Sequence, residues 1–203
     1  MIKTIIFDFG DVFINLDKEN AIKNIFNLLQ IEKLSEEILA VNNLYEQGLV
    51  STDEFITFYL ENFPKLSRQN LIDAWNSILL DLPEHRLKFL KNLKATTNYK
   101  LILLSNTNEL HIDWIKENIS IYNAFKNCFD AFYLSHEINL RKPNANIFEF
   151  VLSKNNLNAS ECLFIDDTSE HILSAKSLGI HTWNLNPKHE DVTDLSKVKP
   201  DLF

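Results

Sequence analysis

The sequence predicts an α/β protein: a Rossmann-like parallel sheet sandwiched by helices, with an inserted four-helix cap domain. The sheet is predicted by short apolar runs that recur between polar turn residues, and by apolar residues at helical spacing between the later runs. This strand–helix alternation is typical of a parallel sheet covered by helices on both faces. The insert is predicted by residues 15–87, which separate the first two runs and show only helical patterns.

Five apolar runs are predicted to be the parallel strands. They are Thr4–Phe9, Tyr99–Leu104, Ala131–Leu134, Leu163–Ile165 and His181–Trp183. The helical pattern before the last strand stops at Gly179, a residue typical of helix C-termini. The segment after Pro187 is polar, and we expect it to be a surface extension.

Four apolar stripes predict the helices of the insert. The stripes are Ile22 to Leu29, Ile38 to Tyr45, Phe55 to Tyr59, and Leu71 to Leu82. Between the second and third stripes, Gly48 is predicted to end one helix, while Ser51 and Glu54 form a capping box that starts the next. Pro83 then opens a helix that leads back to the sheet.

The insert divides the chain into two predicted domains. Residues 15–87 are too many for a single crossover connection, so we predict that they form the helical cap. Residues 1–14 and 88–203 are then the Rossmann-like core.

Composition excludes several classes of partner. A net charge of −8 and a pI near 5.2 argue against binding to nucleic acid or to an anionic membrane surface. No apolar run approaches the roughly 20 residues that span a bilayer. Cys128 and Cys162 fit no metal-ligand spacing and no disulfide framework, which is typical of reduced thiols. We expect a cytoplasmic protein, a monomer or weak homodimer.

Polar residues stand where four of the predicted strands end. Asp8 ends the first run, Ser105 the second and Asp166–Asp167 the fourth, while Lys142 follows the third, just before a predicted helix. The carboxyl ends of parallel strands meet at one edge of a sheet, where ligands bind. We therefore expect these side chains to face the same rim.

Each of these residues also has a structural explanation. Asp and Ser are common N-cap residues of helices, so Asp8 and Ser105 could each cap the segment that follows. Lys142 is harder to explain in this way, because a cation beside a helix N-terminus opposes the macrodipole, typically by about 0.3–1 kcal/mol. The adjacent carboxylates Asp166 and Asp167 repel each other where they are partly buried, and a divalent cation relieves that repulsion. Because four such features fall on four strand ends, we interpret them as one functional site.

These four segments resemble the motifs of the haloacid dehalogenase superfamily of hydrolases, most of which are Mg²⁺-dependent phosphatases. "IIFDFG" is similar to motif I, "LILLSN" to motif II, "LRKP" to motif III and "LFIDD" to motif IV, in that order. The insert after motif I resembles the C1-type cap of the family. The wording of the motifs is similar to that of bacterial phosphatases of small sugar phosphates, α-D-glucose 1-phosphate among them.

The resemblance implies a nucleophile and a metal site. Asp8 corresponds to the nucleophile that forms an aspartyl-phosphate and also binds Mg²⁺. The backbone carbonyl of Gly10 would be a further ligand, and Asp167 a direct or nearly direct one, with Asp166 orienting a metal-bound water or sharing the ion. A carboxylate is repelled by a dianionic phosphate, and Mg²⁺ with one ammonium makes its approach possible.

The resemblance also implies how the substrate is held. Ser105, helped by the backbone N–H of Asn106, would bind the phosphate, and Lys142 would neutralise it and steady Asp8. Glu46, near the end of a cap helix, is a candidate for hydrogen bonds to sugar hydroxyls. Trp75 and His111 are interpreted as packing or structural residues.

Gly10 departs from the usual family pattern, which has an acid/base aspartate two residues after the nucleophile. Losing such a group typically costs about 10²–10⁴-fold in rate. Asp11, one residue later, is a candidate replacement, and water or a cap residue is another. The third alternative is a slow or retired enzyme.

We therefore expect a Mg²⁺-dependent phosphomonoesterase of a small phosphorylated metabolite, a sugar phosphate. The rival is a non-catalytic or very slow phosphometabolite-binding protein. A 2-haloacid dehalogenase is disfavoured by Gly10, where that branch typically has Tyr, and by the metal-suited Asp166–Asp167 pair.

Overall fold

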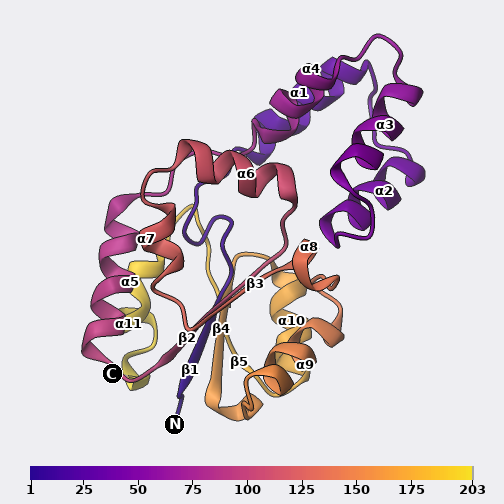
Figure 1. The fold of residues 1–203 in the computed structure, drawn as a ribbon. Coiled ribbons are helices and arrows are strands. Elements are labelled where there is room, and N and C mark those ends of the chain that lie inside the picture. Colours follow the sequence, from indigo (N-terminus) through magenta and orange to yellow (C-terminus); the bar gives the residue numbers. More distant parts are fainter. Residues whose placement is uncertain (203) are drawn as a thin grey trace.

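The computed structural model describes residues 1–202, and it confirms the predicted fold class. All strands lie parallel in a five-stranded sheet of order β3-β2-β1-β4-β5 (Figure 1). The strands are β1 (Thr4–Phe7), β2 (Lys100–Ser105), β3 (Ala131–Leu134), β4 (Cys162–Asp166) and β5 (His181–Asn184). Each coincides with a predicted run to within two residues at either end.

Helices cover both faces of the sheet (Figure 1). One layer contains α5 (Glu84–Thr96), α6 (Glu109–Asn118), α7 (Tyr122–Lys126) and α11 (Leu195–Val198). The other contains α9 (Ala145–Lys154) and α10 (Ser169–Ser177). The short elements are α8 (Ser135–Ile138), η1 (Ala159–Glu161), η2 (Val192–Asp194) and η3 (Pro200–Leu202).

The continuous apolar run of β1 follows from burial on two sides. Ile5 and Phe7 point into one core cluster and Ile6 into the other, because side chains alternate along a strand. All four residues of β1 are buried. The central strand is therefore fixed between two apolar layers, and its end positions the first polar residue, Asp8.

Four helices follow β1 and form a group that we call the helical lobe, residues 18–76. They are α1 (Lys18–Leu29), α2 (Glu36–Glu46), α3 (Thr52–Asn62) and α4 (Arg68–Asn76). The lobe has its own apolar cluster, in which Tyr45 stacks on Phe55 with ring centroids 4.1 Å apart. The predicted capping box of Ser51 and Glu54 is confirmed. The division of the chain into core and cap domains stays a prediction.

The fourth predicted stripe overran its helix. It extended to Leu82, whereas α4 ends at Asn76. The backbone of residues 78–81 instead pairs with residues 15–17 through three hydrogen bonds of 2.8–3.1 Å. We call these two paired segments the linker, because they join the lobe to the sheet. A non-local backbone ladder has replaced the helix that the local apolar spacing indicates.

The expectation of a surface extension after Pro187 was wrong. Val192 and Leu195 are fully buried in the core on the α5 side of the sheet. Asp191 accepts a 2.9 Å hydrogen bond from Nε of Arg86, which is itself buried. These two buried apolar residues and the Arg86–Asp191 contact hold the polar segment against the protein.

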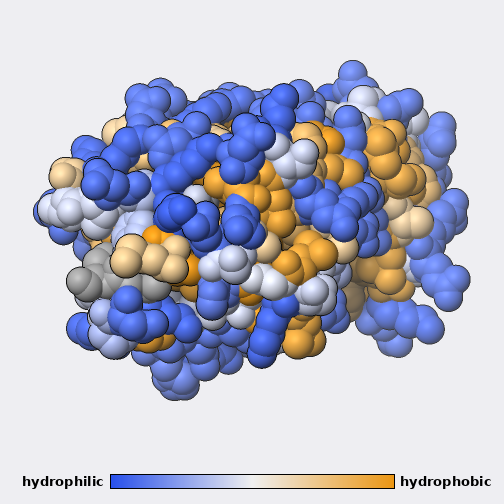
Figure 2. Space-filling model, turned by 90° about the horizontal axis from the view of Figure 1, so that it is seen from below, coloured by the Kyte–Doolittle hydropathy of each residue, from blue (hydrophilic) through white to orange (hydrophobic). Residues whose placement is uncertain are grey.

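One face of the molecule is mostly polar. On the face seen from below in Figure 1, hydrophilic side chains predominate and hydrophobic ones gather in patches between them (Figure 2). Within residues 1–202, no helix is long and apolar enough to cross a membrane.

The lobe contacts the core where α2 ends. Ser135 Oγ donates a 2.5 Å hydrogen bond to the Glu46 carbonyl, and Asn139 Nδ2 donates a 2.9 Å bond to that of Gln47. Gly48 follows with φ of 65°, so close to the core that a Cβ there would lie 2.0 Å from the His136 carbonyl oxygen. A glycine is therefore required twice, by conformation and by contact.

Replacing Gly48 by Ala is expected to displace the lobe from the core. The matched control is Gly179→Ala, because Gly179 also has positive φ (83°) but a Cβ at that position would meet nothing nearer than 4.0 Å. The control should lose only about 1–2 kcal/mol of unfolding free energy, the cost of the left-handed conformation. Gly48→Ala should lose more in urea unfolding and should speed hydrogen exchange around residues 46–48. Equal losses in the two variants would contradict this contact.

Candidate active site

The polar residues at the strand ends meet at one rim, as the sequence predicted. Asp8 follows β1, Ser105 ends β2 and Asp166 ends β4, and all three are buried. The Asp8 N–H donates a 2.9 Å hydrogen bond to the Ile165 carbonyl, which continues the pairing of β1 with β4. Parallel strands thus bring together residues that are far apart in the chain.

Lys142 lies at the centre of this cluster, with its side chain 0% exposed. Its Nζ donates to Asp8 Oδ1 (2.6 Å), to Asp166 Oδ2 (2.7 Å) and to the Leu104 carbonyl (2.9 Å). These three partners use all three ammonium protons. Burial alone would lower the pKa of Lys142, but the two carboxylates raise it instead. The buried ammonium is therefore fully charged and fixed in place.

Asn106 clamps the backbone of Lys142. Its Oδ1 accepts a 2.9 Å hydrogen bond from the Lys142 N–H, and its Nδ2 donates a 2.9 Å bond to the Lys142 carbonyl. The side chain of Asn106 thus positions the lysine. The phosphate contact expected of its backbone N–H stays a prediction.

The pKa values of the two buried carboxylates, Asp8 and Asp166, are shifted in opposite directions. Burial raises the pKa of Asp8 to about 7, against the attraction of Lys142 and with the added repulsion of Asp166. Burial also opposes ionisation of Asp166, but Lys142 and a hydrogen bond from His171 hold its pKa below the usual value. His171 Nδ1 lies 3.0 Å from Asp166 Oδ2, a contact that no spacing pattern in the sequence indicated.

Asp8, Asp166 and Asp167 fit a divalent cation. Each offers a carboxylate oxygen, and these oxygens lie within 4.8 Å of one another. Hard oxygen donors are the ligands that Mg²⁺ prefers. Burial first, and then the negative charges of Asp166 and Asp167, raise the pKa of Asp8, and a bound cation would favour the ionised form. The Gly10 carbonyl as a further ligand stays a prediction.

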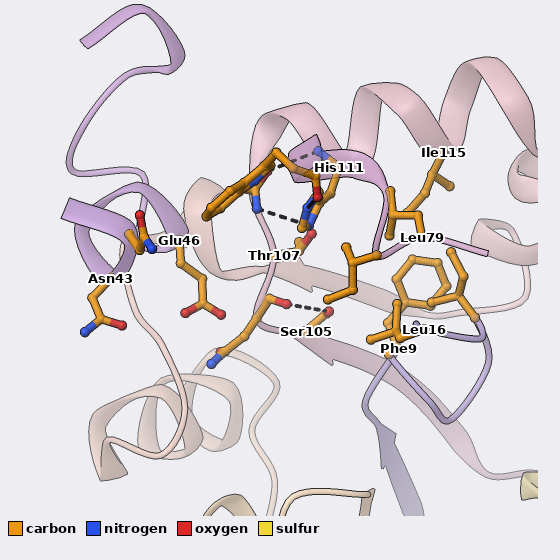
Figure 3. Close-up of a pocket in the computed structure, with 16 residues that line it drawn as sticks. Phe9, Leu16, Asn43, Glu46, Leu79, Ser105, Thr107, His111 and Ile115 are labelled. Carbon is orange, nitrogen blue, oxygen red and sulfur yellow. Dashed lines mark hydrogen bonds between the residues drawn. The ribbon is translucent and has the colours of Figure 1, made fainter. Parts of the chain in front are cut away.

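A cavity of about 300 Å³ lies beside the cluster, between core and lobe (Figure 3). Ser105 and Asn106 line it from the core and Glu46 from the lobe. Its remaining lining is Phe9, Gly10, Ile14, Leu16, Asn42, Asn43, Trp75, Ile78, Leu79, Thr107, Asn108, His111 and Ile115. The apolar stripe that correctly placed Trp75 on α4 did not indicate that its ring borders a cavity.

Glu46 is held at the cavity by Arg141. Nε and Nη2 of Arg141 both donate to Glu46 Oε2, over 2.9 and 2.7 Å. This leaves Oε1 without a hydrogen bond from Arg141, and the carboxylate points into the pocket in Figure 3. The lobe thus supplies an anionic hydrogen-bond acceptor on the side of the cavity opposite Leu16 and Leu79 (Figure 3).

Asp11 has other contacts. Its φ is 54°, its Oδ1 accepts a 3.1 Å hydrogen bond from the Leu16 N–H, and its Oδ2 lies 2.7 Å from Lys18 Nζ. It does not line the cavity. These contacts support a structural role, and proton transfer by Asp11 stays a prediction.

The space beside Gly10 is taken by Leu16. A Cβ on Gly10 would lie 2.8 Å from Leu16 Cδ1. Leu16 belongs to the linker and forms part of the cavity wall. Because Gly10 has no side chain, Leu16 can pack in the space that a Cβ at residue 10 would need.

His111 ties the lobe to the core. Its ring stacks on Trp75 with centroids 5.9 Å apart, its Nε2 lies 3.2 Å from the Trp75 carbonyl, and its Nδ1 lies 3.1 Å from Asn108 Nδ2. Nδ1 accepts from the Asn108 amide, so Nε2 carries the proton and donates to Trp75. Burial lowers the pKa of His111 to about 4.

The chain is similar to known proteins over most of its length. A family model described as haloacid dehalogenase-like hydrolase matches residues 2–179. The D-ribitol-5-phosphate phosphatase of Bacteroides thetaiotaomicron is 29% identical over 192 residues, which cover 90% of this chain and 91% of that protein.

Two solved structures are also similar. One is a haloacid dehalogenase family enzyme from Bacteroides thetaiotaomicron in complex with magnesium and inorganic phosphate. It has 34% identity and a TM-score of 0.83, covering 96% of this chain and 99% of that one. The other is a hydrolase of the same kind from Porphyromonas gingivalis, with 28% identity and a TM-score of 0.81, covering 100% and 98%.

The lowered pKa of His111 predicts a pH-dependent stability. The unfolded chain binds this proton near pH 6.5, but the native state binds it only near pH 4. The contribution of neutral His111 is therefore complete above pH 6.5 and is lost as pH falls toward 4. Relative to His111→Gln, the wild type should lose up to about 3 kcal/mol of unfolding free energy between pH 7 and 4.

Urea unfolding at a series of pH values measures this difference. The exposed His189 provides the matched control, and His189→Gln should follow the wild type throughout. A constant difference between wild type and His111→Gln across the pH range would contradict the buried, neutral state of His111.

Proposed function

The chain belongs to the haloacid dehalogenase-like hydrolase family, and from this premise we propose that it is a magnesium-dependent phosphomonoesterase. Its substrate is a small phosphorylated metabolite, a sugar or sugar-alcohol phosphate. The observation that carries the proposal is the buried ion cluster of Lys142, Asp8 and Asp166 beside a cavity between core and lobe. The name of the Bacteroides relative, D-ribitol-5-phosphate phosphatase, supports the same substrate class.

Asp8 is the nucleophile. One carboxylate oxygen attacks phosphorus, the bond to the leaving oxygen breaks, and an aspartyl-phosphate forms on Asp8 until water hydrolyses it. Lys142 holds Asp8 Oδ1 at 2.6 Å, which orients the carboxylate and offsets part of its repulsion from the phosphate. Because the ammonium is clamped before substrate arrives, little reorganisation is needed.

The cofactor is Mg²⁺, held by Asp8, Asp167 and the Gly10 carbonyl, with Asp166 sharing the ion. When bound, it neutralises the phosphate oxygens on which charge develops. The grouped carboxylate oxygens support this assignment.

Substrate is held by residues from both sides of the cavity. Ser105 and the backbone N–H of Asn106 bind the phosphate on the core side, and Glu46 accepts hydrogen bonds from the hydroxyls of the leaving group. The cavity of about 300 Å³ is at the small end of ligand pockets. This size favours a sugar or polyol phosphate over a nucleotide.

A second candidate function is favoured by Gly10. With Leu16 packed beside it, no carboxylate stands two residues after Asp8. A protein that binds phosphometabolites and turns them over very slowly, or not at all, is therefore the alternative. The metal-suited carboxylates speak against a 2-haloacid dehalogenase, whose reaction needs no metal.

Phosphate release from a panel of sugar and sugar-alcohol phosphates tests the function. Release should require Mg²⁺, stop with a chelator, and fall by at least about 10³-fold in Asp8→Asn, because the nucleophile is lost. Asp53→Asn, which removes an exposed lobe carboxylate, is the matched control and should keep the wild-type rate. Binding of phosphate analogues without turnover of any substrate would support the slow binding protein instead.

Glu46→Gln tests how the leaving group is recognised. Weakening a hydrogen bond to a charged acceptor should raise KM for the best sugar or polyol phosphate by about tenfold or more. KM for p-nitrophenyl phosphate, which has no such hydroxyls, should change little. Glu61→Gln, on an exposed part of the lobe, is the control. An equal rise in KM for both substrates would argue that Glu46 acts only through lobe position.

A further inference from the structure

Lys18 reaches from the lobe to the candidate metal site. It is the first residue of α1, and its Nζ lies 2.8 Å from Asp167 Oδ2 and 2.7 Å from Asp11 Oδ2. Its side chain is 47% exposed, whereas those of Asp167 and Asp11 are 11% and 15% exposed. The ammonium therefore sits at the solvent side of the carboxylate cluster.

The Lys18 ammonium is paired with one carboxylate oxygen of Asp167, a candidate metal ligand. Asp167 belongs to the group of three carboxylates, and its other oxygen, Oδ1, lies 3.3 Å from the hydroxyl of Thr168. Asp8 and Asp166 share the fixed ammonium of Lys142, whereas the third carboxylate, Asp167, is paired with Lys18. A divalent cation bound by Asp167 and the Lys18 ammonium would repel each other, and Lys18, unlike the buried Lys142, is partly exposed and can move away.

We propose that Lys18 is an internal counter-ion that competes with the divalent cation for Asp167. It neutralises Asp167 in the metal-free protein and gives way when the cation binds. This inference rests on the magnesium site of the proposed function, and adds a positioning residue that none of the four sequence motifs contains.

Asp11 is the carboxylate with which Lys18 stays paired when the cation binds. Its carboxylate is fixed by the Leu16 N–H and lies 2.7 Å from the ammonium, so Lys18 keeps one anionic partner after it leaves Asp167. Asp11 holds this position with φ of 54°, a conformation that Asp and Asn tolerate better than most residues. Asp11 thereby acquires a role that requires no proton transfer.

Titration with Mg²⁺ alone, followed by calorimetry, tests the competition. Lys18→Met should bind Mg²⁺ about three- to tenfold more tightly than wild type, because the cation no longer displaces a partly exposed ion pair. Lys23→Met removes the same charge from an exposed position on the same helix and should leave the Kd unchanged. The double variant Lys18→Met with Asp11→Asn restores the wild-type net charge and should still bind more tightly, which separates competition from the general field.

Thermal unfolding gives a second readout. Lys18→Met should melt below the wild type in a chelator, because Asp167 then lacks its counter-ion, and level with it in saturating Mg²⁺. An unchanged or weaker Mg²⁺ affinity in Lys18→Met would overturn the proposal, as would a double variant that returns to the wild-type Kd. Circular dichroism confirms that each variant is folded.

Phosphate release from the same samples keeps this proposal distinct from the proposed function. Metal-dependent release with identical Mg²⁺ affinities in wild type and Lys18→Met would overturn only the competition. Tighter binding in Lys18→Met without any release would support the competition and remove the phosphatase. Absence of Mg²⁺ binding in both proteins would overturn the competition together with the metal site.

Discussion

The buried ammonium of Lys142 is the interaction on which the site depends. Parallel strands bring Asp8 and Asp166 to one rim, where their charges would repel each other at low exposure to water. Lys142 bonds to both and uses its third proton on the Leu104 carbonyl. Breaking a buried ion pair by removing one partner typically costs about 3–5 kcal/mol. The cation that holds Asp8, the proposed nucleophile, is therefore also the one that stabilises the acidic rim.

A second constraint is that the cavity exists only while the lobe rests on the core. Its walls come from the core (Ser105), from the linker (Leu79) and from the lobe (Glu46). The lobe is held by Ser135 and by the contact at Gly48, and neither involves a catalytic side chain. The shape of this cavity thus depends on a docking contact that lies outside the four strand-end motifs.

The sequence predicted those features that depend on local pattern. Strands buried on both sides appear in the sequence as short apolar runs, and the polar residues that follow these runs predicted the rim of the site. Features that depend on distant contacts were missed or misplaced. The buried tail at Val192 and the early end of α4 were set by packing and backbone pairing across the fold. His171 and Lys18 carry no motif, because their significance lies in which carboxylate they meet.

Gly10 shows how the chemistry and the packing of this site are linked. A side chain at this position would begin 2.8 Å from Leu16 Cδ1, so a carboxylate here and the present position of Leu16 exclude each other. Leu16 is paired with Leu79 across the linker, and both line the cavity. To accommodate an acid at residue 10, the side chain of Leu16 would have to rotate out of this position in the cavity wall. Gly10 and the apolar cavity wall at Leu16 therefore go together. In the proposed mechanism, residue 10 then supplies no proton for the leaving group, and Asp11, water and the lobe side of the cavity, where Glu46 is the anionic residue of the lining, are the alternatives.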